Sequence, residues 1–153
     1  MEALDVTDAS ALVSRKRSEL GAIFRDGGTS IPDGRGRGTV LIGTGGLPAR
    51  AVAVIAYALA WRGKIVDRPA GRLKNLLTPL SVPAIAAKVY EDASWYDGKD
   101  CVVLDYSSTS FVARRIRDEI REVGPGVFLG MVFVGRRHAL DFALDFTGRD
   151  GSH

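Results

Sequence analysis

Residues 87–106, AKVYEDASWYDGKDCVVLDY, decide the fold, because two runs of alternating or apolar residues meet there at Asp97-Gly98. Asp-Gly between such runs is the strongest short-range signal for a β-hairpin, since glycine adopts the positive φ that the tight turn requires. The return strand is expected over Asp100–Tyr106. The stretch therefore predicts two adjacent antiparallel strands.

Further strands and tight turns follow toward the C-terminus. Gly124-Pro125-Gly126 predicts a turn after residues 118–123, whose period is ambiguous between helix and strand. A strand is expected over Val127–Val134, and a polar loop at Gly135-Arg136-Arg137 separates it from Leu140–Phe146, where large apolar residues alternate. Short turns cannot join parallel neighbours, so these strands form an antiparallel meander, which closure into a barrel would free of exposed edges. An open, half-buried sheet gives the same alternation and remains the alternative.

The first half of the chain mixes helical and extended patterns. An apolar stripe predicts a helix over Asp8–Phe24, and a glycine-rich composition predicts a loop over Asp26–Gly38. A strand over Thr39–Ile42, a buried apolar helix over Pro48–Ala60 and a strand over Trp61–Val66 are expected next. The helix over residues 48–60 is therefore expected to connect two strands, one before it and one after it.

Two segments have weaker patterns. Prolines at Pro79 and Pro83 interrupt residues 73–83, which predicts irregular chain there. Ser107 is a suitable N-cap, so a helical turn is expected from it to Arg117.

The composition is that of one folded domain. With 153 residues, 46% of them hydrophobic and 25% charged, the chain is long enough to bury its own core. We divide it into an N-terminal helix and loop (1–35), a barrel domain (36–147) and a flexible C-terminal tail (148–153).

Charge and apolar patterns exclude several classes of partner. The net charge is only +3, and basic residues alternate with acids, as in Arg114–Glu122, so nucleic-acid binding is not expected. The longest apolar run, Ala51–Trp61, is about half a membrane span, and residues 1–25 lack the apolar core of a secretory signal. The single cysteine, Cys101, has no disulfide partner and lies in an apolar run. We expect a cytoplasmic protein with no membrane segment, cofactor or metal, and a homodimer remains an open alternative.

Residues 39–48, TVLIGTGGLP, imitate a dinucleotide-binding unit. An apolar helix follows them, and the acid Asp67 lies about twenty residues on, as such a unit requires. However, Pro48 stands where the third glycine would allow close helix packing, and the rest of the chain supplies hairpins instead of parallel strands. The nucleotide-binding interpretation is therefore not favoured.

The same stretch carries a resemblance to a known family. Residues 36–45, GRGTVLIGTG, an apolar helix and then Trp61-Arg62-Gly63-Lys64 resemble the opening of small lipocalin-like bacterial proteins that contain a GXWXG motif. Most members of that family have no assigned function. Val40 and Leu41 stand where the family has the tryptophan of its first motif.

A second part of the resemblance lies late in the chain. The matching positions, an acid, a basic residue, a valine and a Leu-Gly pair, are Asp118, Arg121, Val123 and Leu129-Gly130. The resemblance covers residues 36–146. It implies a mainly β (α+β) fold, an antiparallel lipocalin-like β-barrel with an N-terminal helix and a helix that covers the barrel mouth.

Polar residues in apolar strands are the candidates for a site, because polar groups inside a barrel of about eight to ten strands must be paired. Lys64 is a candidate ligand for a carboxylate, although a lysine that reaches solvent from a strand end is the more ordinary interpretation. Asp105 and Tyr106 end an apolar run, so one of them faces inward. They are the candidate catalytic pair, with Asp105 as a base and Tyr106 as its hydrogen-bonding partner. An aspartate that merely starts a turn is the favoured alternative for Asp105.

Arg121 is a candidate for binding a carboxylate or phosphate, with Asp118 and Glu119 as internal ion-pair partners. If this stretch is helical, Arg117 and Arg121 are surface neighbours one turn apart with Asp118 and Glu122 as compensating charges, and that interpretation is favoured. The aromatic candidates for core or pocket wall are Trp61, Tyr90, Trp95, Phe128 and Phe142. His138 lies in a polar loop where solvent is expected, and the sequence offers no Ser-His-Asp or Cys-His arrangement.

Three functions fit this sequence. The first is binding of a small, mainly apolar or amphipathic molecule in the barrel interior. The second is a cofactor-independent isomerase or cyclase of small-molecule (secondary) metabolism that uses the same pocket. The third is a structural or partner-binding module with a filled interior.

Overall fold

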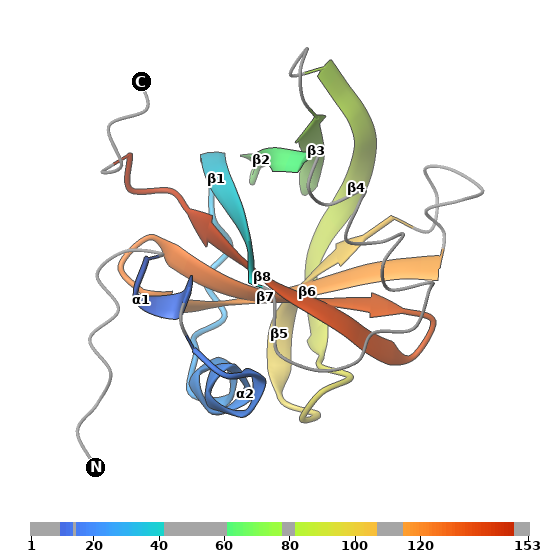
Figure 1. Ribbon diagram of the computed structural model, residues 1–153. Coiled ribbons are helices and arrows are strands. Elements are labelled where there is room, and N and C mark those ends of the chain that lie inside the picture. The colour runs from blue at the N-terminus through green and yellow to red at the C-terminus, as the bar shows by residue number, and fades with distance from the viewer. Residues whose placement is uncertain (1–9, 14, 42–60, 78–81, 107–114, 149–153) are drawn as a thin grey trace.

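The computed structural model describes residues 10–13, 15–41, 61–77, 82–106 and 115–148, and these form a closed antiparallel barrel (Figure 1). Strands follow one another around the barrel in chain order, and β8 closes it by pairing with β1. The helices and strands are α1 (Ser10–Val13), α2 (Arg17–Arg25), β1 (Gly34–Leu41), β2 (Trp61–Asp67), β3 (Arg72–Leu77), β4 (Val82–Ala93), β5 (Asp100–Asp105), β6 (Ile116–Gly124), β7 (Val127–Val134) and β8 (Arg137–Asp145).

The closed barrel confirms the mainly β, lipocalin-like fold expected from the sequence. Asp97-Gly98 lies in the turn between β4 and β5, and Gly98 has a φ of 76°. Gly126, in the turn between β6 and β7, has a φ of 73°. Because β1 pairs antiparallel with both β2 and β8, the open-sheet and dinucleotide-binding interpretations are excluded.

Several predicted boundaries are wrong. Residues 72–77 and 82–93 are strands, although irregular chain was expected over 73–83. Pro83 fits because it pairs with Leu76 beside a register shift, where one ladder hydrogen bond is lost anyway. The predicted loop ends earlier than expected, since β1 begins at Gly34.

Other differences concern helices. The predicted helix over residues 8–24 is divided into α1 and α2, with Lys16 in extended conformation at the α2 N-cap. The ambiguous segment 118–123 is part of β6, which begins at Ile116, so the helical turn expected up to Arg117 is wrong at its end. The expected helix over residues 48–60 and the start of that turn lie outside the described residues.

The two faces of the barrel carry different clusters of buried side chains. The interior cluster includes Val102, Leu104, Ile120 and Phe142, which alternate with outward residues along their strands. The outer cluster lies where α2 covers the barrel wall and includes Phe24, Leu129 and Met131, as the position of α2 in Figure 1 shows. Parity along each strand therefore decides whether a candidate residue faces the interior or the outer wall.

Candidate functional site

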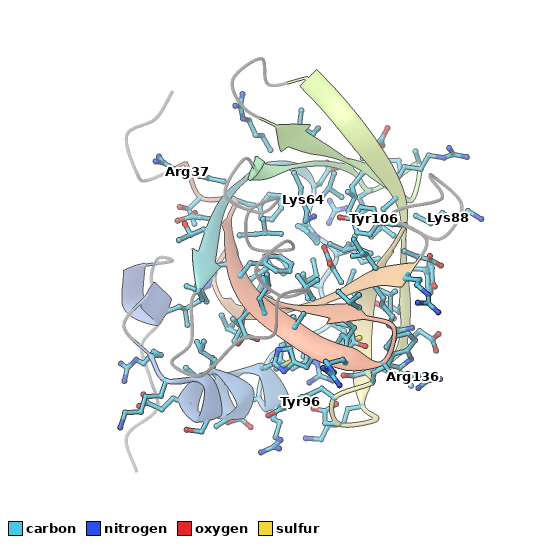
Figure 2. All side chains as sticks on the ribbon, turned by 45° about the vertical axis from the view of Figure 1, so that its right-hand side comes forward. Arg37, Lys64, Lys88, Tyr96, Tyr106 and Arg136 are labelled. Atoms are coloured by element: carbon cyan, nitrogen blue, oxygen red, sulfur yellow. The ribbon has the colours of Figure 1, made fainter. Side chains whose placement is uncertain are left out.

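Three polar residues meet inside the apolar barrel: Lys64 from β2, Tyr106 directly after β5 and Asp118 from β6. Lys64 is 3% exposed and Tyr106 2% exposed, and both point into the space that the strands enclose (Figure 2). Lys64 Nζ donates to Tyr106 Oη over 2.5 Å, and Tyr106 Oη donates to Asp118 Oδ2 over 3.2 Å. Lys64 Nζ lies 3.2 Å from the same Oδ2. Each of the three groups thus contacts the other two.

The charges of Lys64 and Asp118 are both opposed by burial. Loss of hydration lowers the pKa of Lys64, and the neighbouring Asp118 carboxylate only partly reverses that shift. Loss of hydration likewise raises the pKa of Asp118, against the effects of Lys64 and Tyr106. Burial thus opposes the charged forms of two groups whose Nζ and Oδ2 atoms lie 3.2 Å apart, a distance over which a proton can pass between them.

One carboxylate oxygen of Asp118 accepts no hydrogen bond from the described residues. Oδ2 contacts Lys64 and Tyr106, whereas Oδ1 is buried and finds no hydrogen-bond partner among the described residues. Buried carboxylate oxygens are normally satisfied, and an unsatisfied one costs about 1–3 kcal/mol or more. The site can therefore accept one further hydrogen bond at a fixed position.

Aromatic side chains complete the interior around this set. Lys64 Nζ lies 5.6 Å from the centre of the Phe142 ring, at a distance suited to a cation–π contact. The Phe142 ring lies directly against Gly130, where a Cβ would collide with it. Phe128 packs edge-on against Phe146, with ring centres 5.4 Å apart. Tyr106 and Phe142 thus lie close to Lys64, whereas Phe128 belongs to the same interior cluster but lies nearer the other end of the barrel.

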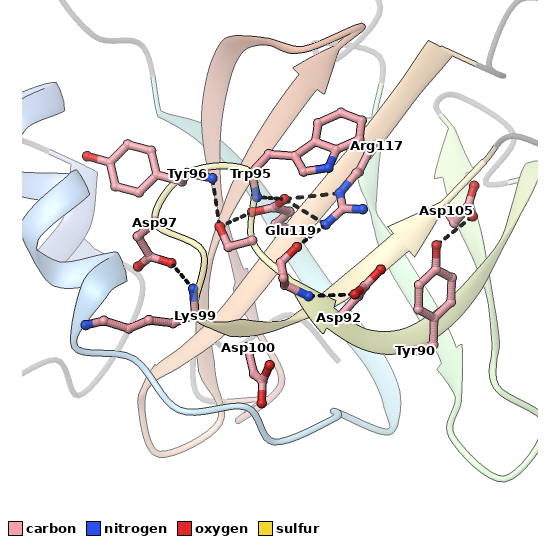
Figure 3. Close-up of polar contacts among 12 residues, drawn as sticks. Tyr90, Asp92, Trp95, Tyr96, Asp97, Lys99, Asp100, Asp105, Arg117 and Glu119 are labelled. Carbon is pink, nitrogen blue, oxygen red and sulfur yellow. Dashed lines mark hydrogen bonds and ion pairs between the residues drawn. The ribbon is translucent and has the colours of Figure 1, made fainter.

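Asp105 and Tyr106, the predicted catalytic pair, lie on opposite faces of the barrel wall. Asp105 pairs across the strands with the exposed Lys88, which places both on the outer face. There Asp105 Oδ2 accepts a hydrogen bond of 2.8 Å from Tyr90 Oη (Figure 3). Asp118 thus occupies the position beside Tyr106 that the sequence analysis gave to Asp105. The catalytic role of the original pair stays a prediction.

Arg121 is buried on the outer face, not on a solvated helix surface, so the favoured surface interpretation is wrong. Its guanidinium holds the Asp97 carboxylate through two bonds of 2.6 and 2.8 Å. It also donates to the carbonyl of Phe24 at the end of α2 and to those of Lys99 and Asp100. Arg121 therefore joins helix, hairpin and barrel wall, and these contacts use its donors for structure.

Trp95 belongs to the same outer region. Its ring packs edge-on against Phe133, and the guanidinium groups of Arg117 and Arg136 lie 4.4 and 4.3 Å from its centre. The buried Glu119 accepts from Trp95 N and from Arg117 Nε, as Figure 3 shows. Trp95, Tyr90 and Arg121 thus do not face the interior, contrary to the pocket assignment made from the sequence. The side chain of Trp61 lies outside the described part of the chain.

Sequence reasoning missed the role of Asp118, which it considered only as a partner of Arg121. The signal was present in the alternation, because Asp118 shares its parity with Ile120 whereas Arg121 shares its parity with Glu119. It became usable only when residues 116–124 were known to form a strand. His138 is also less solvated than expected, since its Nε2 lies 2.7 Å from Asp141 Oδ1.

Comparisons with known proteins support the fold alone. The sequence matches no protein-family model and shows no significant similarity to a curated protein. A solved structure described as a protein from Thermomonospora curvata is similar over 86% of this chain and 87% of that one, with a TM-score of 0.59 and 19% sequence identity. Within the described residues, every helix is too short or too polar to cross a membrane. The chain is thus a structural neighbour of a bacterial protein and shares its overall barrel architecture.

Proposed function

We propose that the barrel binds a small, mainly apolar molecule that carries one hydrogen-bond donor, and that Asp118 accepts from this donor. The observation that carries the proposal is the buried Asp118 Oδ1, which has no partner among the described residues. A ligand hydroxyl or N–H would satisfy that oxygen. The surrounding apolar side chains, including Val102, Leu104 and Phe142, would receive the rest of the molecule.

The position of the polar set fits this role. β5 ends at Asp105 and β6 begins at Ile116, so Tyr106 and Asp118 lie near one end of the barrel. Near the other end, Phe128 and Phe146 pack their rings together, and the Phe146 amide binds the carbonyl of Gly126. In this proposal the polar group of the ligand binds near the end of the barrel where Tyr106 and Asp118 lie.

Two matched probes test the proposal on the full chain. 1-Octanol and octyl methyl ether have the same alkyl chain, but only the alcohol has a donor. Methyl resonances of Val102 and Leu104 report on the interior, and those of Val127 and Leu129 report on the outer wall. We expect saturable shifts at the interior methyls, and a preference for the alcohol of about tenfold or more, the value of a charge-assisted hydrogen bond.

Variants separate the anchor from the apolar interior. Asp118→Asn weakens the acceptor and is expected to reduce the preference for the alcohol, whereas Lys88→Gln, at an exposed outer position, is expected to leave it unchanged. Equal affinity for alcohol and ether in the unmodified protein would show that Asp118 is not the anchor. If neither probe shifts the interior methyls up to its solubility limit, the binding proposal fails and a filled module is favoured.

A cofactor-independent isomerase or cyclase is the second candidate function. It is favoured by the contact of Lys64, Tyr106 and Asp118, which joins proton donors and an acceptor within 3.2 Å. 2-Decanone in D2O is a simple probe of proton abstraction beside a carbonyl. Protein-dependent deuterium incorporation that is reduced in Asp118→Asn would support this function, and incorporation at the buffer rate would exclude this acid–base role.

A further inference from the structure

The buried amine of Lys64 has the surroundings of a nucleophile. Its Nζ lies 5.2 Å from the centre of the Tyr106 ring and 5.6 Å from that of Phe142, and the side chain is 3% exposed. Tyr106 Oη and Asp118 Oδ2 lie 2.5 and 3.2 Å from it. A lysine becomes nucleophilic when an apolar site disfavours its ammonium form.

We infer that Lys64 is a site of imine formation, at which Nζ condenses with the carbonyl carbon of an apolar aldehyde or ketone held in the barrel. The inference rests on the proposed function, because the carbonyl compound must first enter the interior. It extends that function from reversible binding of a donor-bearing molecule to covalent capture of a carbonyl one.

The condensation balances without another reagent. The lone pair of the neutral amine forms a bond to the carbonyl carbon, and the π electrons of the carbonyl move to oxygen, which takes up a proton. Both protons of the neutral amine reach the oxygen by way of Asp118, the carbon–oxygen bond breaks, and the oxygen leaves as water while the nitrogen lone pair forms the carbon–nitrogen double bond. One amine and one carbonyl group thus give one imine and one water, with no change of oxidation state.

The neighbouring groups supply the proton movements. Asp118 takes the proton of the ammonium over 3.2 Å and returns it to the departing oxygen, and the lowered pKa of Lys64 makes the neutral amine accessible. Tyr106 Oη, 2.5 Å from Nζ, holds the amine in position and donates to Asp118. If the product is protonated, the iminium cation occupies the place of the ammonium beside Asp118, so the ion pair is kept.

Reductive trapping of the full chain tests the inference. The protein is incubated with octanal and sodium cyanoborohydride near pH 6, where lysines of ordinary pKa, about 10.4, are almost wholly protonated. Intact mass and peptide mapping then locate the octyl group. We expect addition at Lys64 to be faster than at the exposed Lys88 and Lys99, because its lowered pKa leaves more of the neutral amine, and peptide mapping separates this addition from that at the N-terminal α-amino group. Asp118→Asn is expected to slow the addition at Lys64 and not at Lys99, because the loss of the proton carrier outweighs the loss of the charge that raises the pKa of Lys64.

The outcomes separate this inference from the proposed function. Labelling of Lys64 at the rate of Lys99 or slower, while 1-octanol still shifts the interior methyls, would overturn imine formation and leave ligand binding standing. Failure of both probes would overturn both. Lys64→Arg removes the nucleophile but keeps a cation, and loss of the added mass in it supports the assignment. Mapping of the unmodified chain decides the matter even if that variant does not fold.

Discussion

Lys64 Nζ and Asp118 Oδ2 lie 3.2 Å apart, although their strands, β2 and β6, stand opposite each other in the closed ring of strands. The contact therefore crosses the barrel interior and ties two walls that share no backbone ladder. A buried pair of this kind stabilises little by itself, but removal of one partner leaves a buried group without compensation.

Lys64→Met is expected to reduce the free energy of unfolding at pH 7 by about 3–5 kcal/mol. The substitution removes the cation that lowers the pKa of Asp118, so that pKa rises further above the value of 3.8 in the unfolded chain. The unfolded state then releases the proton of Asp118 more readily than the folded state does. The stability of the variant should consequently fall as the pH rises above about 4, which urea denaturation across a pH series would measure.

Controls for this variant come from the same chain. Lys64→Met/Asp118→Asn removes the uncompensated carboxyl and should recover most of the lost stability, whereas Lys88→Met at an exposed position should stay within about 0.5 kcal/mol of the parent. A double variant no more stable than Lys64→Met would show that packing of the lysine stem, and not its charge, explains the loss.

Asp105→Asn is expected to lower the pKa of Tyr90. That pKa is raised to about 12, first by loss of hydration and then by the hydrogen bond and negative charge of Asp105. The substitution removes the charge but not the burial, so the pKa should fall and yet remain above its ordinary value of 10.0. Phenolate absorbance during an alkaline titration measures the change, and Tyr90→Phe identifies the signal. An unchanged titration would contradict the contact between Tyr90 and Asp105.

The local signals in the sequence predicted what depends on neighbouring residues. Asp97-Gly98 and Gly124-Pro125-Gly126 gave the turns correctly, because the conformation of a tight turn depends on its own residues. Residues 73–83 were misjudged because Pro83 is tolerated at a register shift that only the partner strand reveals. The register between paired strands, even between the consecutive strands β3 and β4, was thus the part that local patterns could not supply.

The site was predictable only in part for the same reason. Lys64 and Tyr106 were both named as site candidates, although a lysine that reaches solvent was the more ordinary interpretation of Lys64. Their common partner, Asp118, lies on the strand next to that of Tyr106 but opposite that of Lys64, so the contact with Lys64 forms only on closure of the barrel. Arg121 was assigned to ligand binding because a buried guanidinium and a solvated one look alike in a sequence. Its five donors are used instead by Asp97 and three backbone carbonyls.

Cys101 is expected to be inert to thiol reagents in the folded protein. It is fully buried, and loss of hydration together with the charge of Glu119 raises its pKa to about 12. The reactive thiolate is therefore rarer than in an unfolded chain by roughly a thousandfold or more at neutral pH. Ellman's reagent should release one equivalent of thiol promptly in strong denaturant and almost none in native buffer. Native reaction at the denatured rate would contradict the buried position.

Asp97→Asn should destabilise the protein at pH 7 by about 1.5–3 kcal/mol, because it converts a paired, charge-assisted contact with Arg121 into a neutral one. The hydrogen bond from Arg121 lowers the pKa of Asp97 below the value of 3.8 in the unfolded chain. This stabilisation is therefore complete above about pH 4 and is lost as the pH falls through the lower, folded pKa. Unfolding free energies of the parent and Asp97→Asn should consequently converge in acid.

Asp92→Asn serves as the matched control, because Asp92 is exposed near the end of β4, and it should follow the parent at every pH. A difference between parent and Asp97→Asn that stays constant down to pH 2 would show that the contact with Arg121 stabilises through shape instead of charge.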